Sequence, residues 1–460
     1  MLFPYHKFLY IIKRRRKFTL LSLFNKYFLN VVTPILLLSA GMLLSIRLRL
    51  FYVFHPLRSI KLLLKKERRG DTSPFSALCL ALAGTLGVGN IVGVASAIII
   101  GGYGSVFWMW VSALLAMSLK YAEIVISMKY REQLSDGYRG GAAYYIRAAF
   151  SSLKLGWIAS VLSTAFAIFC VLNSLTMGCM LQSNAISSSF SESFGIPPWV
   201  VGIITSVLFI FAILYKSGRV EKITGIIVPV MSLLFIVVSV IAIIMRRERL
   251  PEAFSAIFKN ALDPRCIGGG ALGFLTSRAF RAGSMRGLVS NEAGAGTAPT
   301  AHAMSDTKIP EKQGLMGVIE VFADTIILCT LTALVIILSG TDPCFSDPMA
   351  LILSSYSDIL GEGANTFICI SIFLFAFATL ICWAKYGASS LLYLTESKAV
   401  RIIYMIIFSA LITVGTLFTS NIIWDTADFS IGIMTLINLL SLFILQREIT
   451  KPNFKNTPTK

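Results

Sequence analysis

The residues Ala81-Leu-Ala-Gly-Thr-Leu-Gly-Val-Gly-Asn-Ile-Val-Gly93 lie inside an apolar run, Phe75 to Ile100, that is otherwise long enough to cross a bilayer. Each glycine weakens a helix interior by about 1 kcal/mol relative to alanine, and Asn90 adds a polar amide. Unwound backbone at membrane depth is tolerated only where it lines a cavity or is buried in protein. Two interpretations are open at this point: a broken transmembrane helix that binds a solute or an ion, or an unbroken helix packed closely against a neighbour.

The composition is that of a polytopic membrane protein. Hydrophobic residues make up 56% of the 460 residues and charged residues 14%, and the mean hydropathy is +0.76. The net charge of +18 does not indicate a nucleic-acid partner, because Lys and Arg lie in short loops between apolar runs. The eight cysteines form no CxxC pair, which argues against a zinc site or a disulfide framework. We expect no cofactor and no obligate protein partner.

Apolar runs of about 20 residues predict eleven transmembrane segments. They lie at 27–46, 75–100, 104–128, 156–180, 198–215, 220–245, 267–283, 314–339, 365–386, 402–420 and 422–445. Loops 47–69 and 129–155 are rich in Lys and Arg, whereas 181–197 has neither. Because basic loops stay in the cytoplasm, this pattern predicts a cytoplasmic C-terminus.

A second glycine-rich stretch, Ile267-Gly-Gly-Gly-Ala-Leu-Gly-Phe274, begins the sixth span counted from 75–100. Broken helices at the first and sixth spans are what two five-helix halves of inverted topology require, so the pair favours a transporter over simple helix packing. The predicted organisation is a basic extension, a peripheral transmembrane helix, two five-helix repeats and a cytoplasmic tail, at 1–26, 27–46, 75–245, 267–445 and 446–460.

Several motifs together resemble the alanine or glycine:cation symporter family. They are Gly84-Thr-Leu-Gly-Val-Gly-Asn-Ile-Val-Gly-Val-Ala95, Phe107-Trp-Met-Trp110, Lys120-Tyr-Ala-Glu123, Ser290-Asn-Glu-Ala-Gly294, and Asp324-Thr325 with Cys329-Thr330. The resemblance covers nearly the whole chain. It implies an all-α, LeuT-type five-plus-five inverted repeat with one additional N-terminal transmembrane helix. It also implies a secondary transporter in a bacterial inner membrane that imports alanine or glycine with sodium, or sometimes protons.

The two breaks are the expected substrate site. A small zwitterion needs amide donors for its carboxylate and oxygen acceptors for its ammonium group, and broken helices supply both. The expected binding residues are Thr85, Gly87, Gly89 and Asn90 in the first break and Gly269, Gly270 and Gly273 in the second. Glycines against the substrate predict selection for alanine over leucine.

Two further substrate residues are implied by the resemblance. Gln182 resembles the family's glutamine near the substrate amino group, the alternative being a loop-facing amide at a helix end. Trp383 matches a family tryptophan that closes one side of the pocket.

The resemblance places a sodium ion between the first and eighth core helices. There the carbonyl of Ala376 and the hydroxyl of Thr379 are implied to face carbonyls near Ala83 and Leu86. The alternative for Thr379 is a hydroxyl bonded back to its own helix.

Other polar residues fall inside apolar spans. Lys120 and Glu123, three apart, predict an ion pair on one helical face. Asp324 is costly in a membrane unless paired, which makes it a functional candidate. We expect residues 290–292 to cap or gate the second break and His302 to be structural.

Rival functions are not all excluded. No Walker A motif occurs, and none of the three histidines has a partner suited to an intramembrane hydrolase, so we expect neither an ATP-driven pump nor an enzyme. A proton-coupled symporter, an ion channel or ion-only transporter on the same fold, and a receptor that binds alanine without transport stay open. Ala378, where the family usually has serine, and Lys385 depart from the family pattern and leave the coupling ion undecided.

Overall fold

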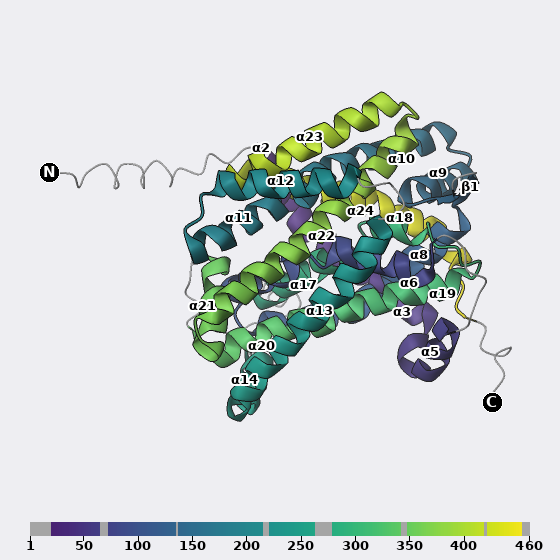
Figure 1. Ribbon diagram of the computed structural model, residues 1–460. Coiled ribbons are helices and arrows are strands. Elements are labelled where there is room, and N and C mark those ends of the chain that lie inside the picture. Colours follow the sequence, from purple (N-terminus) through teal and green to yellow (C-terminus); the bar gives the residue numbers. More distant parts are fainter. Residues whose placement is uncertain are drawn as a thin grey trace.

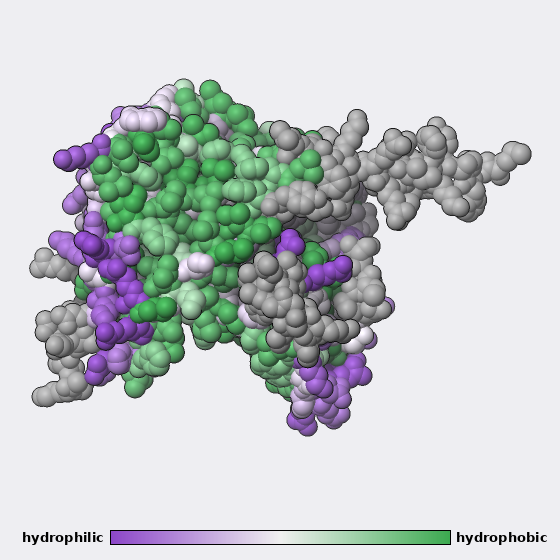
Figure 2. Space-filling view, turned by 180° about the vertical axis from the view of Figure 1, so that it is seen from behind, coloured by the Kyte–Doolittle hydropathy of each residue, from purple (hydrophilic) through white to green (hydrophobic). Residues whose placement is uncertain are grey.

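The computed structural model describes residues 20–64, 72–134, 137–214, 220–262, 278–341, 347–417 and 421–452. Within these residues the chain is almost entirely helical, and eight helices are long and apolar enough to cross a membrane. Three of the eleven predicted spans are not among these eight helices. Span 75–100 is two short helices, span 198–215 is a 17-residue helix, and span 267–283 lies partly outside the described residues. Apolar side chains cover the middle of one face and hydrophilic ones gather at its edges (Figure 2). The chain is therefore a multi-pass membrane protein.

The first group of core helices follows a short N-terminal region. That region contains α2 (Leu20–Phe24), η1 (Asn25–Leu29), α3 (Asn30–Leu48), α4 (Phe51–Phe54) and α5 (Pro56–Leu64). The core helices are α6 (Pro74–Thr85), η2 (Val88–Asn90), α7 (Val92–Gly101), α8 (Gly104–Lys129), α10 (Gly156–Leu175), η3 (Thr176–Met180), α11 (Leu181–Phe194), α12 (Pro198–Leu214) and α13 (Val220–Met245). An antiparallel hairpin of β1 (Glu132–Leu134) and β2 (Gly137–Arg139), with Gln133 opposite Tyr138, precedes α9 (Ala142–Ser152).

The second group begins after η4 (Arg247–Arg249) and α14 (Leu250–Ala261). It comprises α17 (Arg278–Asn291), α18 (Ala298–His302), α19 (Pro310–Val321), η5 (Phe322–Cys329), α20 (Thr330–Ser339), α21 (Pro348–Leu360), α22 (Gly363–Leu394), α23 (Lys398–Leu417), α24 (Asn421–Ile444) and η6 (Gln446–Glu448). Figure 1 shows α12 and α23 side by side, with α13 crossing the bundle in front of α6.

The glycine-rich stretch at 81–93 does break its helix, as predicted. Leu86 leaves the helical region with φ −75° and ψ 60°, and the amide of Gly87 turns back to the carbonyl of Thr85 at 2.8 Å. In an unbroken helix that amide would bond the carbonyl of Ala83. The break therefore leaves the Ala83 carbonyl without its helical donor.

A second interruption joins α17 to α18. Glu292, Gly294 and Gly296 have φ values of 52°, 86° and 76°, a left-handed conformation that ends a helix. The predicted second break at 267–274 lies outside the described residues. The interruption that the structure describes comes later, in the Ser290-Asn-Glu-Ala-Gly294 motif.

The two broken helices run antiparallel. At one end, a Cβ on Gly101 would lie 2.9 Å from the carbonyl oxygen of Arg278, so the end of α7 meets the start of α17. At the other end, the amide of Asp306, just after α18, donates to the carbonyl of Thr72, just before α6, at 2.9 Å. Opposite chain directions for the first helix of each half are what an inverted repeat requires.

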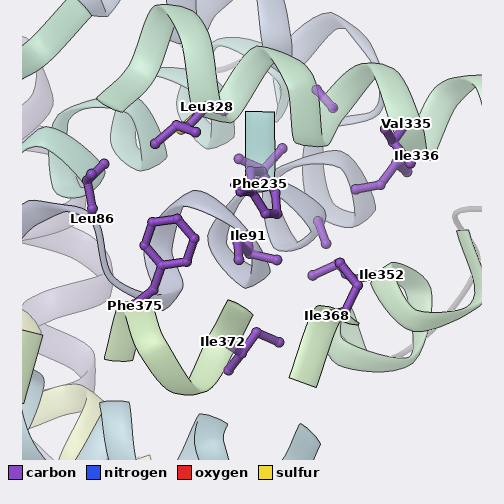
Figure 3. Close-up of a cluster of buried hydrophobic side chains, with 14 of the residues drawn as sticks. Leu86, Ile91, Phe235, Leu328, Val335, Ile336, Ile352, Ile368, Ile372 and Phe375 are labelled. Carbon is purple, nitrogen blue, oxygen red and sulfur yellow. The ribbon is translucent and has the colours of Figure 1, made fainter. Parts of the chain in front are cut away.

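An apolar cluster fixes the first break in the core. Leu86 and Ile91, on either side of the break, belong to one buried cluster with Phe235 of α13, Phe375 of α22 and Leu328 of η5, and Figure 3 draws these side chains. These side chains are at most 1% exposed. The packing holds the break in place, so that its polar backbone groups are presented to a defined set of neighbours.

The additional N-terminal helix α3 packs outside the core. A Cβ on Gly41 would lie 2.9 Å from the carbonyl oxygen of Leu115, which shows how closely α3 approaches α8. The hydroxyl of Ser45 donates to that of Ser118 at 2.9 Å between the same helices. The predicted additional helix is therefore confirmed.

Candidate functional site

The two interruptions meet at the carboxylate of Asp324. Asn90, in the first break, donates from Nδ2 to Oδ1 of Asp324 at 2.6 Å and to its main-chain carbonyl at 3.1 Å. Ser290, at the end of α17, donates from Oγ to Oδ2 of Asp324 at 3.0 Å. All three residues are at least nine-tenths buried. Asp324 thus connects both broken helices to the helix that contains it.

The local helix geometry explains the position of Asp324. Residues 322–329 form a π-helix, η5, a widened turn that is frequent at functional sites. Thr325 donates from Oγ1 to Oδ2 of Asp324 at 2.7 Å, and Asn291 donates from Nδ2 to that Thr325 oxygen at 3.2 Å. The carboxylate is therefore surrounded by neutral polar groups. Among the described residues no lysine, arginine or histidine forms an ion pair with it.

Gln182 and Thr379 meet the opposite side of the first break. Gln182 accepts from the amide of Val88 at 3.2 Å and donates to the carbonyl of Met177 at 3.3 Å. A Cβ on Gly87 would lie 3.0 Å from Gln182 Oε1 and 3.0 Å from Thr379 Oγ1. Gln182 is buried within the continuous α10–η3–α11 rod rather than facing a loop. The structure thus brings three predicted site residues together.

The Thr379 hydroxyl makes both of the contacts considered from the sequence. It lies 2.9 Å from the carbonyl oxygen of Ala83 and 3.0 Å from that of Phe375 in its own helix. The break removes the helical amide that would donate to the Ala83 carbonyl. The hydroxyl of Thr379, in α22, donates to that carbonyl instead. Leu86 and Ala376, the other predicted sodium-site residues, are also buried, at 1% and 0% exposure.

Thr85 and Gly89 have different surroundings. The hydroxyl of Thr85 donates back to the carbonyl of Ala81 at 3.4 Å. Gly89 is exposed although its neighbours are buried, and a Cβ there would lie 3.8 Å from Cα of Ser290. The backbone at Gly89 is therefore accessible beside the second interruption.

Trp383 lies against the π-helical turn of the α10–η3–α11 rod. A Cβ on Gly178 would lie only 2.4 Å from the Trp383 side chain, so a glycine is needed there. The indole also contacts Tyr386 edge-on, with ring centroids 5.6 Å apart. The predicted site glycines Gly269, Gly270 and Gly273 lie outside the described residues.

The predicted ion pair between Lys120 and Glu123 is wrong. Lys120 bonds Glu320 of α19 at 3.2 Å, with both side chains fully buried, and His302 Nε2 lies 3.0 Å from the other oxygen of Glu320. Glu123 instead accepts from the amide of Asn438 in α24. The helical spacing allowed a local pair, but α19 packs along α8 and brings a second carboxylate closer. His302 therefore does have a carboxylate partner from an apolar span.

Arg131 holds the segment that follows the second interruption. It donates to the carbonyls of Ala303 at 3.1 Å and Thr307 at 2.8 Å, and it lies over the ring of Tyr138 at 3.6 Å. Burial lowers the pKa of the guanidinium from its ordinary value, while the nearby Tyr138 and Asp306 raise it. No sequence pattern indicated this contact, because it joins the hairpin after α8 to a distant loop.

A family comparison covers almost the whole chain. Residues 16–455 match the model of the sodium:alanine symporter family. The chain belongs to the sodium:alanine symporter family. Its membership makes it a cation-coupled transporter of amino acids and not an enzyme.

Several known proteins are similar to this chain over most of their length. An uncharacterized transporter of Haemophilus influenzae is 36% identical over 94% of both chains. The sodium/alanine symporter AgcS of Methanococcus maripaludis is 33% identical over 93% of this chain and 94% of its own. The probable sodium/glutamine symporter GlnT of Bacillus subtilis is 34% identical over 90% of this chain and 85% of its own.

A solved structure shows the fold of this family member. MhsT, crystallised with L-phenylalanine, superposes with a TM-score of 0.53 at 16% identity, covering 83% of this chain and 90% of MhsT. The LeuT-type five-plus-five fold predicted from the sequence is thereby confirmed.

Proposed function

We propose that this family member imports small neutral amino acids, alanine and glycine, together with sodium by alternating access. The observation that supports this most is the grouping of Gly87, Gln182 and Thr379 around the first break. It joins an amide side chain suited to a substrate ammonium group with a hydroxyl suited to sodium. The lack of a side chain at Gly87 lets Gln182 and Thr379 approach the break closely, and the exposure of Gly89 leaves its backbone accessible to a small substrate.

The proposed substrate site contains the residues predicted from the first break and its neighbours. It comprises Thr85, Gly87, Gly89, Asn90, Gln182 and Trp383, with Gly269, Gly270 and Gly273 retained from the sequence alone. The proposed sodium site comprises the carbonyls of Ala83, Leu86 and Ala376 and the hydroxyl of Thr379. The contact of Thr379 with Ala83 supports it, because both oxygens lie where the broken helix has lost its own hydrogen bond.

The proposed mechanism couples the two sites through the break. Sodium bound between α6 and α22 orders the unwound segment, so the amino acid pays less of that ordering cost and binds more tightly. The occupied bundle then rocks to the other side of the membrane. We further propose a bacterial inner-membrane location with the C-terminus in the cytoplasm, which the basic loops support.

Uptake into proteoliposomes tests the proposal. Labelled alanine, glycine, glutamine and leucine are supplied under a sodium gradient, a proton gradient or neither. We expect sodium-driven accumulation of alanine and glycine and little uptake of leucine. Preference for leucine or glutamine overturns the small-substrate assignment, proton-driven uptake without sodium overturns the coupling ion, and flux that ignores both gradients indicates a channel.

A further inference from the structure

We propose that this transporter binds one anionic glycerophospholipid in a groove between α3, α8 and α24, with an acyl chain in the groove and the phosphate at Arg47. The groove lies outside the transport site, and the proposal does not depend on which amino acid or ion is carried. It assigns a role to the additional N-terminal helix α3, which the proposed function leaves without one.

An open apolar groove is the first observation. Its volume is about 260 Å³, and its lining includes Leu43 and Leu44 of α3, Leu119 of α8, and Leu442 and Phe443 of α24. Leu43 and Phe443 are 52% and 45% exposed, which places them at the rim, while Leu119 is fully buried and forms the floor. Since no water lies at membrane depth, a groove between spanning helices opens to the acyl chains of the bilayer.

The dimensions of the groove fit an acyl chain. The lining residues of α3 run from Ala40 to Arg47, a rise of about 10 Å along the helix. One leaflet of a bilayer contains about 15 Å of hydrocarbon, so the groove covers most of that depth. Two turns of a helix about 10 Å wide would occupy about 800 Å³, which is well above the volume of the groove. The groove therefore suits a lipid chain and not a helix of another protein.

Arg47 forms the polar end of the groove. Its Nη1 donates to Oε1 of Gln446 at 3.4 Å, a long hydrogen bond, and its side chain is exposed. Among the described residues no carboxylate forms an ion pair with Arg47. A guanidinium has five N–H donors in a planar fork that matches the oxygens of a phosphate. Arg47 can therefore bind the phosphodiester of a lipid whose chain lies in the groove.

The helix α5 shows that Arg47 lies near the membrane surface. In α5 the exposed Leu57, Ile60 and Leu64 recur at three- and four-residue spacing, and Arg58 and Lys61 are exposed between them. An amphipathic helix with basic residues on its polar side lies in the plane of the interface. Figure 1 shows α5 at the margin of the bundle. Because α5 follows soon after the end of α3, that end lies at the level of the lipid head groups.

The charge of the same region selects the head group. Residues 47–69 include eight Lys and Arg residues and a single acid, Glu67. Basic clusters directly after a spanning helix attract anionic lipids. Lipid tails are as apolar as leucine, so an acyl chain alone gains little by leaving the bilayer for the groove. Affinity therefore comes from the phosphate at Arg47, and selectivity comes from the net negative charge of the head group.

Native mass spectrometry of the delipidated full-length protein tests the proposal. Phosphatidylglycerol and phosphatidylcholine with identical acyl chains are added separately, and the bound lipids are counted. We expect one phosphatidylglycerol, held about fivefold more tightly than phosphatidylcholine. Arg47→Gln should remove most of that preference. Arg49→Gln should keep it, because Arg49 is also exposed but does not line the groove.

Two results of this experiment overturn the proposal. One is equal binding of the two lipids by the wild type. The other is an equal loss of preference in Arg47→Gln and Arg49→Gln, which would show diffuse attraction to the basic residues instead of a built site.

A second pair of variants tests the groove itself. Leu43→Trp places a larger side chain at the rim and should weaken phosphatidylglycerol binding by about fivefold. Met42→Trp is the matched control, because Met42 is 57% exposed at the neighbouring position but does not line the groove. Thermal unfolding in detergent checks that both variants fold. Unchanged binding by Leu43→Trp overturns the proposal, and so does a wild-type dimer that binds no lipid and is lost in Leu43→Trp, since a second copy then covers the groove.

Discussion

Asn90 in the first helix break donates a hydrogen bond of 2.6 Å to the carboxylate of Asp324 in η5. The same carboxylate accepts from Ser290 at the end of α17, so one buried acid connects the two interrupted helices. A movement of either broken helix must change the surroundings of Asp324. The hydrogen bonds of Asp324 therefore depend on how the two broken helices are placed relative to each other.

Asn90→Ala is expected to lower both sodium-dependent alanine binding and uptake. The change leaves Oδ1 of Asp324 without its 2.6 Å donor, and a hydrogen bond to a charged group is worth about 1.5–3 kcal/mol. Binding is measured on purified protein and uptake in proteoliposomes. Asn260→Ala is the control, because that amide is exposed and bonds only within its own helix. Transport at the wild-type level would remove Asn90 from the site.

Thr379→Ala is expected to raise the sodium concentration needed for half-maximal alanine uptake. It removes the hydroxyl that reaches the Ala83 carbonyl across 2.9 Å. Thr435→Ala serves as the matched control, since that buried hydroxyl bonds only to Ile431 one turn earlier in its helix. Sodium titrations of uptake distinguish the two. An equal effect of both substitutions would mean that the loss of a helical hydroxyl, rather than a sodium ligand, is responsible.

Gly178→Ala is expected to abolish or sharply reduce transport. Its added Cβ would lie 2.4 Å from the Trp383 side chain, so the indole must move. At Gly225 in α13 nothing lies within 4 Å of an added Cβ, and alanine there removes the conformational freedom of glycine. We expect Gly225→Ala to transport normally. Uptake assays on both variants, after matching their amounts in the membrane, check the prediction; normal uptake by Gly178→Ala contradicts it.

Lys120→Met is expected to destabilise the protein by about 3–5 kcal/mol, because it removes the lysine that neutralises the buried Glu320 and leaves only His302 beside that carboxylate. The double variant Lys120→Met with Glu320→Gln should regain much of that loss. Thermal unfolding in detergent measures both. Breaking the partly exposed pair through Arg246→Gln should cost no more than about 1 kcal/mol. A double variant as unstable as Lys120→Met would show that the charge pair is not the cause.

Local sequence patterns were sufficient to locate the membrane-spanning helices that the structure describes. Apolar runs located the described spanning helices, since a bilayer demands a fixed length of uninterrupted apolar helix. The glycines at 84, 87, 89 and 93 located the first break for a similarly local reason, because they remove helix propensity wherever they occur. Periodicity failed for Lys120, whose partner Glu320 comes from a helix far away in the chain.

The sequence by itself determined the class of protein, the first break and the polar residues that a membrane must accommodate, because each follows from the composition of a short segment. Tertiary structure decided where the interruption between α17 and α18 lies and which polar groups come into contact. Gly294 and Gly296 lie in the interruption that separates α17 from α18. The antiparallel packing of the two broken helices brings Ser290 into contact with Asn90 and Asp324. Such contacts depend on how helices pack, and no local spacing encodes that.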